Sequence, residues 1–271
     1  MSSVRFLSLT GAAATLIALT SCGNPQTPNP STPEVNGSPA TTSQTTAPPS
    51  TAADQQQDVD YMTALGLMKG HLLVAKELLD QGKPDQAEPH IGHPIEELYA
   101  DVENQLPERN VKDFKPTLNT LHDFVKSKPN APEITTEYKT AMQEIDQAIE
   151  ALPVSERQSP DFILSVINRM LSTAEEEYNA AIANGKIVET IEYQDARGFI
   201  LYANTLYQSI GDQVSQDYPD QGQTLESSLN ELQNALPSAT PPATPVMTPE
   251  EVSTLTQTIQ QTSQTISSSP S

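Results

Sequence analysis

Residues 59–84, VDYMTALGLMKGHLLVAKELLDQGKP, decide the fold class of this chain. Their apolar side chains recur every three or four positions, which is typical of an amphipathic α-helix packed against a core. The pattern ends at Gly82 and Pro84, because glycine favours a helix C-terminus and proline cannot continue a helix. We therefore predict a first helix from about Val59 to Gln81.

The same helical pattern continues nearly throughout the chain towards the C-terminus, and no alternating strand pattern competes with it. Prolines mark most of the expected helix ends. After the first helix, the expected helices span residues 84–106, 111–125, 132–152, 160–184, 187–214, 222–236 and 249–266. The sequence therefore predicts an all-α fold.

Two short motifs recur at a fixed distance along this helical region. The Gly-Lys pair at residues 82–83 returns at residues 185–186, and the Tyr-Ala pair at residues 99–100 returns at residues 202–203. Both shifts are 103 residues, and apolar ladders in the fourth and last expected helices match at a shift of 117. Fixed shifts of this kind indicate an internal duplication.

The duplication predicts two divergent four-helix units, each large enough to bury a bundle core, which can also pack together. The units cover residues 57–153 and 160–268. The alternative is that amphipathic helices of biased composition match by chance.

Acidic residues dominate the charge of the chain. Lysine and arginine number 14 against 35 aspartates and glutamates, which gives a formal net charge of −21. Without a basic stripe to contact a phosphate backbone, nucleic acid is excluded as a partner, and so is adsorption to an anionic membrane surface. Most of these carboxylates are expected to serve solubility, with a cation or a basic partner as the alternative.

The N-terminal segment has the layout of a cleavable secretory signal. Arg5 precedes an apolar stretch at residues 6–18, which is too short to span a bilayer as a helix. It is followed by Leu19-Thr20-Ser21-Cys22, in which Cys22 is the sole cysteine of the chain. These four residues resemble a bacterial lipoprotein box. The alternative is an ordinary signal peptide followed by an incidental thiol.

The resemblance implies that residues 1–21 are removed as a lipoprotein signal peptide. Cys22 would then carry a diacylglycerol thioether and an acylated N-terminus, with palmitate as a typical fatty acid. The resemblance thus implies that the protein is attached to a membrane through this lipid. It also implies a location in the bacterial cell envelope, facing the periplasm or the exterior. Gly23 and Asn24 lack an aspartate retention signal, which favours the outer membrane.

Residues 22–56 are predicted to be the lipidated cysteine and a disordered linker. The stretch consists mainly of proline, serine, threonine, asparagine, glutamine and alanine, so it has too little apolar surface to fold. A flexible chain of this length reaches roughly 30–35 Å, which would hold the folded part away from the membrane.

Histidine is confined to the first predicted unit, at His71, His90, His93 and His122. At the shift of 103 residues, the second unit has alanine, tyrosine or leucine in these places. His71 lies eleven residues before Gly82, and His93 lies eleven residues after it. In an antiparallel hairpin that turns at Gly82, equal offsets place the two side chains at the same level.

The second helix of this hairpin adds further candidate ligands. His90, His93 and Glu97 fall at i, i+3 and i+7 on one helical face, with Glu96 adjacent. Two imidazoles and a carboxylate are suitable ligands for a divalent or ferric ion. Pro94 clashes with the carbonyl group of His90 in a regular helix, so we expect it to start a new one. The predicted metal or small-ligand site consists of His71, His90, His93, Glu96 and Glu97.

Each histidine also has a structural interpretation. His71 lies on an apolar stripe, where a hydrogen-bonded core histidine is the alternative to a ligand. His90 and His93 are alternatively exposed polar residues at a kink, and His122 is predicted to be structural. A proton-linked histidine switch is a further alternative to metal binding.

The run His93-Pro94-Ile95-Glu96 resembles the His-x-x-Glu motif of imelysin-like (M75-type) periplasmic proteins. Those are secreted or lipid-anchored helical proteins, often with two related four-helix units, and they are implicated in iron uptake. The resemblance implies a metal role for His93 and Glu96. The sequence departs from the family pattern Gly-x-His-x-x-Glu, because Ile91 stands at the glycine position and Gly92 follows it.

Catalytic signatures are missing from the sequence, including His-Glu-x-x-His, Gly-x-Ser-x-Gly, a Gly-rich phosphate loop and a Cys/His pair. We therefore expect a non-enzymatic, lipid-anchored binding protein for a metal ion or another small ligand. The alternative is a non-catalytic interaction or scaffold lipoprotein that binds another protein of the cell envelope.

Overall fold

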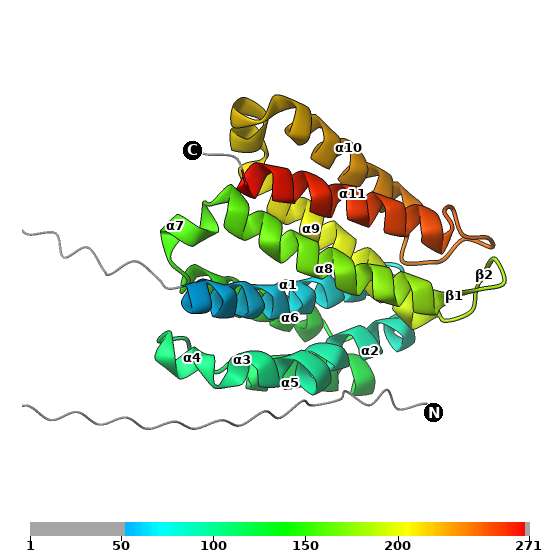
Figure 1. Ribbon diagram of the computed structural model, residues 1–271. Helices are drawn as coiled ribbons and strands as arrows, with labels where there is room; N and C mark the ends of the chain where they lie inside the picture. Colours follow the sequence, from blue (N-terminus) through cyan, green and yellow to red (C-terminus); the bar gives the residue numbers. More distant parts are fainter. Residues whose placement is uncertain (1–51, 269–271) are drawn as a thin grey trace, which may run out of the picture. The chain divides into compact units, whose positions relative to one another are not determined.

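Prolines in first helical turns and glycines in tight turns divide the chain into helices. The structure, a computed structural model, describes residues 52–268. The elements of the first half are α1 (Ala52–Asp80), α2 (Pro84–His93), the π-helix η1 (Pro94–Leu98), α3 (Tyr99–Glu103), α4 (Gln105–Glu108), α5 (Lys115–Ser127) and α6 (Glu133–Glu150). Those of the second half are α7 (Val154–Arg157), α8 (Pro160–Ala181), β1 (Ile182–Ala183), β2 (Lys186–Ile187), α9 (Thr190–Asp217), α10 (Pro219–Ala235) and α11 (Pro249–Ser267). The described part of the chain is essentially all-α, which confirms the predicted fold class (Figure 1).

The predicted signal peptide, Cys22 and most of the predicted linker lie outside the described residues. The linker prediction extends too far, because α1 begins at Ala52 and residues 52–56 are helical. Alanine and glutamine in this stretch have good helix propensity, and Asp54 in the first turn interacts favourably with the helix dipole.

The two Gly-Lys motifs both lie in turns between long helices. Gly82 has a φ of 70° and Gly185 a φ of 67°, a left-handed conformation that glycine adopts at little steric cost. Between α8 and α9, Asn184 also has a positive φ, and Ile182 pairs with Ile187 across the turn. The sequence pattern does not predict this short hairpin. Two consecutive positive φ values fit a type I′ turn, whose twist favours pairing of the flanking residues.

Each half of the described chain contains four principal helices that pack in the same order. In the first half α1, α2, α5 and α6 pack in sequence, and α6 returns to α1. In the second half α8, α9, α10 and α11 pack in sequence, and α11 returns to α8. The halves therefore share a helix order, whereas their origin by duplication stays a prediction.

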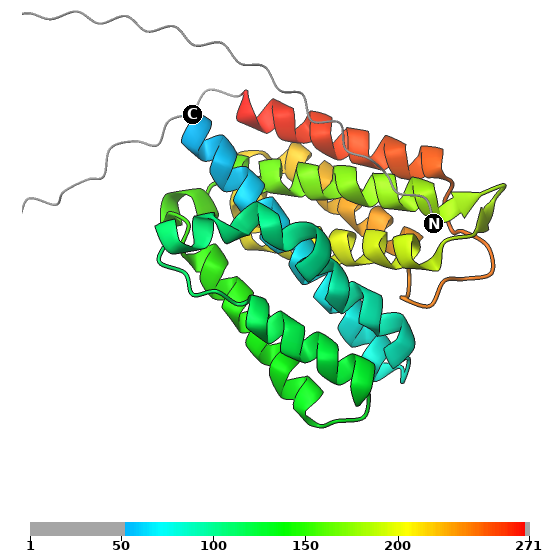
Figure 2. The same ribbon diagram turned by 90° about the horizontal axis from the view of Figure 1, so that it is seen from below.

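Helix α1 joins the two halves. It packs against α8 and α9 as well as against α2 and α6, and in Figure 2 it runs between the helices of the two halves. Its side chains Leu65, Met68 and Leu72 are buried in a hydrophobic core to which both halves contribute. The described residues thus belong to one compact unit. None of their helices is both long and apolar enough to cross a membrane.

Candidate metal centre

Two glycines bring the backbones of α1 and α9 into contact beside the predicted site. A Cβ built on Gly198 would lie 2.3 Å from the carbonyl oxygen of Gly70. His71 follows Gly70 directly, and Asp195 lies three residues, almost one helical turn, before Gly198. The close crossing therefore brings the polar side chains of His71 and Asp195 to the same helix interface.

The α1–α2 hairpin supplies three histidines to this interface. The ring centroids of His71 and His93 lie 5.0 Å apart, as their equal offsets from Gly82 require. The ring of His90 lies 6.3 Å from that of His71 and 6.0 Å from that of His93. The structure thus brings together the three histidines that the sequence analysis selected.

Asp195 of α9 connects the three rings. Its Oδ1 lies 2.7 Å from Nδ1 of His71 and 2.7 Å from Nδ1 of His90. Its Oδ2 lies 3.3 Å from Nδ1 of His93, but without hydrogen-bond geometry, so this buried nitrogen has no hydrogen-bond partner. One potential ligand atom from each of the four residues lies within 4.8 Å of the others.

The cluster is buried except at His93. His90 is 0% exposed, His71 3% and Asp195 4%, whereas the side chain of His93 keeps 21% of its accessible surface. A carboxylate in such surroundings is costly unless positive groups or hydrogen-bond donors compensate its charge. The cluster is therefore reached from solvent on the side of His93.

Both ring nitrogens of His90 face hydrogen-bond acceptors. Nδ1 faces Oδ1 of Asp195, and Nε2 lies 2.8 Å from Oε1 of Gln194. The amide nitrogen of Gln194 donates to the carbonyl oxygen of Ala239, so its oxygen is the atom turned towards His90. A neutral imidazole carries a single N–H and cannot satisfy two acceptors. In that form one ring nitrogen of His90 faces an acceptor without a hydrogen, which is the place where a second hydrogen or a metal ion would fit.

Burial and the Asp195 carboxylate control the charges of the cluster. Burial alone would raise the pKa of Asp195, but His71, His90 and His93 hold this pKa well below its usual range. Burial lowers the pKa of His71, and this effect outweighs the attraction of Asp195. Burial also opposes protonation of His93, but Asp195 and nearby glutamates together raise its pKa. An ionised carboxylate beside a neutral imidazole is suited to metal binding.

Both predicted glutamates lie in the segment that begins at Pro94, and both lie outside this cluster. Pro94 does not open an ordinary α-helical turn but the π-helix η1. A π-turn holds more residues than an α-turn, so the regular α-helical spacing does not apply from Pro94 onwards. Glu97 contributes to the charge environment of His93, while both Glu96 and Glu97 are exposed.

Glu96 and His122 both lie near Gly92. A Cβ on Gly92 would have Oε1 of Glu96 at 4.0 Å and Nε2 of His122 at 3.6 Å. His122 itself lies 2.7 Å from Oε1 of Glu88, which agrees with a structural role. The structure therefore does not bring Glu96 and Glu97 into the ligand set, which is a correction to the predicted site.

The donor set fits a transition-metal cation. In a tetrahedral site with bonds of about 2.1 Å, the donor atoms lie about 3.4 Å apart. The two contacts of Asp195 Oδ1 at 2.7 Å would therefore widen around an ion, and the longest separations, up to 4.8 Å, would shorten. Three imidazoles with one carboxylate suit zinc, copper, iron or nickel better than calcium or magnesium. Nδ1 of His93, which lacks a hydrogen-bond partner, is available as a ligand.

Asp195 is the functional candidate that the sequence analysis missed. It lies in the second half, more than one hundred residues from the histidines, and it belongs to no recognisable motif. The available signal is its position on the buried stripe of α9 formed by Ala196, Phe199 and Ala203. An acidic residue on such a stripe indicates a buried partner.

Comparison with known families finds a match to the second half of the chain. Residues 153–270 match the model of a family described as the iron permease-associated 4-helix bundle domain. The match covers α7 to α11, less than half of the chain, and supports the helical-bundle assignment. Asp195 and Gln194 lie within it, whereas the three histidines lie outside. No curated protein and no solved structure matches the chain.

Proposed function

We propose that this protein is a lipid-anchored, extracytoplasmic binding protein for a first-row transition-metal ion. The proposed ligands are His71, His90, His93 and Asp195. The observation that carries the proposal is the environment of His90, whose two ring nitrogens face Asp195 and Gln194, so that an additional positive charge fits there. A metal ion supplies this charge and also uses Nδ1 of His93, which has no hydrogen-bond partner.

Iron is the proposed cargo. The second half of the chain is similar to a domain described as iron permease-associated. A mixed set of imidazole and carboxylate ligands is also one that iron accepts. The half-buried His93 gives the ion a route to solvent, as a protein that takes up and passes on a metal needs. A scaffold lipoprotein would not require four ligand-type side chains at one buried point.

The metal site is tested by measuring the metal content of the purified protein and its affinity for Fe²⁺ under anaerobic conditions and for Zn²⁺. We expect His71→Ala and Asp195→Asn to weaken binding by about 100-fold or more, because each removes a ligand. His122→Ala is the matched control, since this histidine lies with Glu88 outside the cluster. Absence of binding by the wild type, or equal binding by all variants, would contradict the site.

The proposed anchor at Cys22 needs a separate test. Cells expressing the protein are labelled with a palmitate analogue, and the membrane fraction is examined. We expect the wild type to be labelled and Cys22→Ala to lose the label, because Cys22 is the sole cysteine of the chain. Persistence of the label in Cys22→Ala would contradict anchoring at this residue.

A further inference from the structure

We infer that Gln194 is a positioning residue of the metal centre, which holds hydrogen on Nε2 of His90 and leaves Nδ1 of that ring to the metal ion. The inference rests on the proposed function and adds to it the residue that selects the ligating nitrogen. Gln194 contributes no proposed ligand atom, and it acts on the metal through His90.

The orientation of the Gln194 side chain is fixed by a group that can only accept. Its Nε2 donates to the backbone carbonyl oxygen of Ala239 over 2.8 Å, and it also lies 3.4 Å from Oε1 of Gln86. Rotating the amide by half a turn would place its oxygen against the Ala239 carbonyl oxygen. The oxygen of Gln194 therefore faces His90, at 2.8 Å from Nε2.

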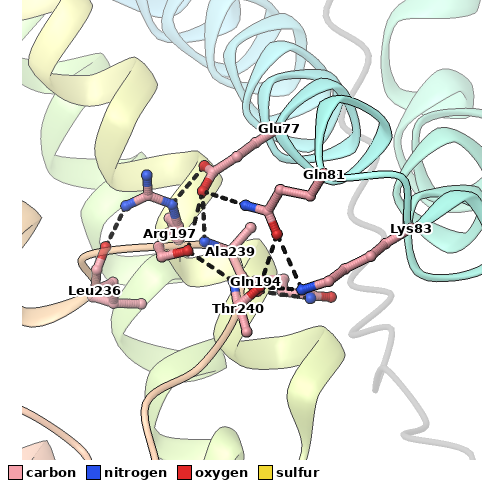
Figure 3. A network of polar contacts seen from close by, with 9 residues as sticks. Glu77, Gln81, Lys83, Gln194, Arg197, Leu236, Ala239 and Thr240 are labelled. Atoms are coloured by element: carbon pink, nitrogen blue, oxygen red, sulfur yellow. Dashed lines mark hydrogen bonds and ion pairs between the residues drawn. The ribbon is translucent and has the colours of Figure 1, made fainter.

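The loop that carries Ala239 is itself held in place by α1 and α9. The backbone N–H of Ala239 donates to Oε1 of Glu77 over 2.8 Å, and Oε2 of Glu77 pairs with Arg197 at 2.9 Å. Arg197 also donates to the carbonyl oxygen of Leu236. Figure 3 shows these contacts.

A second set of contacts fixes the next residue of the loop. The hydroxyl of Thr240 donates to Oε1 of Gln81 over 2.8 Å, and Lys83 donates to the same oxygen over 3.1 Å. Lys83 also donates to Thr240, as Figure 3 shows. The carbonyl group of Ala239 is thus presented to Gln194 by a network that spans both halves of the chain.

Because the contact is buried, water cannot easily replace Gln194 as the hydrogen-bond acceptor for His90. Gln194 is 1% exposed and His90 is 0% exposed, so water has little access to the contact between them. Without the Gln194 oxygen, Nε2–H of His90 would lose its acceptor. The ring would then favour hydrogen on Nδ1, where it donates to Asp195 and occupies the position of the metal. Partners of this kind typically change metal affinity by about 10–100-fold.

The test replaces Gln194 by methionine, which keeps length and removes the acceptor. Nitrogen-15 spectra of the His90 ring are recorded on the metal-free protein, and Zn²⁺ affinity is measured by calorimetry. In the wild type we expect hydrogen on Nε2 of His90. In Gln194→Met we expect hydrogen on Nδ1 alone and an affinity lower by about 10–100-fold.

Gln86→Met is the matched control, because Gln86 contacts Gln194 but has no contact with His90 among the hydrogen bonds of the described residues. It should leave the His90 spectrum and the affinity unchanged. Gln194→Glu is a second variant if the methionine variant does not fold. It keeps an acceptor oxygen for Nε2 and should retain hydrogen there, although the contact with Ala239 is lost.

The inference is overturned if Gln194→Met keeps hydrogen on Nε2 of His90, or if Gln194→Glu loses it. Because the spectra need no metal, the inference and the proposed function fail separately. A wild type that binds no metal but shows the expected shift of hydrogen in Gln194→Met would refute metal binding and support the role of Gln194. Normal metal binding by the wild type, together with an unchanged His90 spectrum in Gln194→Met, would support the metal site and refute the role of Gln194.

Discussion

The backbones of α1 and α9 meet at Gly70 and Gly198, where a Cβ on Gly198 would lie 2.3 Å from the carbonyl oxygen of Gly70. The glycines occur on helices from different halves of the chain. Their contact sets the distance across which His71 of one helix reaches Asp195 of the other. The candidate metal centre therefore depends on a crossing at which neither helix carries a side chain.

Gly198→Ala should lower both the stability of the fold and the metal affinity of the site. The added methyl group meets backbone atoms of α1, so the helices must separate. We expect a loss of roughly 2–4 kcal/mol in the free energy of unfolding, measured by urea denaturation. Metal affinity should fall as well, because His71 and Asp195 move apart.

Gly211→Ala in the same helix is the matched control. The nearest atom to a Cβ at this position belongs to the side chain of Tyr207, at an ordinary distance of 3.6 Å. This substitution should be neutral or stabilise the helix by up to about 1 kcal/mol. If both alanine variants lost the same free energy of unfolding, the close contact of Gly70 and Gly198 would not be the cause.

Asp195→Asn should destabilise the metal-free protein in a pH-dependent way. The pKa of Asp195 is depressed in the folded state, so its stabilising contribution is present above the pKa of an unfolded-state carboxyl group, about 3.9. It is lost as the pH falls through the depressed folded-state pKa. Near pH 7 we expect a deficit of about 3–5 kcal/mol in the free energy of unfolding, measured by denaturation. A deficit that stays constant down to pH 3 would argue against this role.

Glu177→Gln should stabilise the folded protein, which is the opposite of the effect expected for Asp195→Asn. Burial raises the pKa of Glu177 to about 7, with help from the carboxylates of Asp195, Glu192 and Glu97. Because the folded-state pKa is raised, its favourable contribution is present at low pH and is lost as the pH rises through about 7. The amide variant should therefore be more stable than the wild type at pH 8, by on the order of 1–2 kcal/mol after screening by solvent. The exposed Glu176→Gln is the control, and thermal unfolding at pH 5 and pH 8 provides the comparison.

Metal binding should stabilise the fold, because the proposed ligands come from α1, α2 and α9. At a free metal concentration of 100 times Kd, the gain is about 2.7 kcal/mol, which should appear as a rise of several degrees in Tm by scanning calorimetry. A chelator should reverse the rise. His90→Ala should unfold at the same temperature with and without metal, and an undiminished rise in this variant would point to binding elsewhere.

The histidine part of the site could be predicted because it depends on local geometry. His71 and His93 lie at equal distances from Gly82, and a hairpin register follows from counting residues along two helices. The fold class followed in the same way from a repeating apolar pattern, and the structure confirms it.

The carboxylate part of the site could not be predicted by such counting. Regular helical turns predict Glu97 on the face of His90 and His93 with Glu96 adjacent, whereas the structure has a π-helix from Pro94 in which both glutamates are exposed. Glu97 therefore influences the charge of His93 without lying in the ligand cluster.

The sequence by itself thus determined an all-α chain, the position of its first hairpin and the gathering of three histidines on it, because these depend on helix periodicity and on residues near one another in the chain. The tertiary structure alone decided that Asp195 completes the cluster and that Gln194 contacts His90. Both residues lie more than one hundred positions from the histidines they contact. Their placement follows from how closely α1 and α9 pack, which depends on side-chain volume at Gly70 and Gly198 rather than on any local pattern.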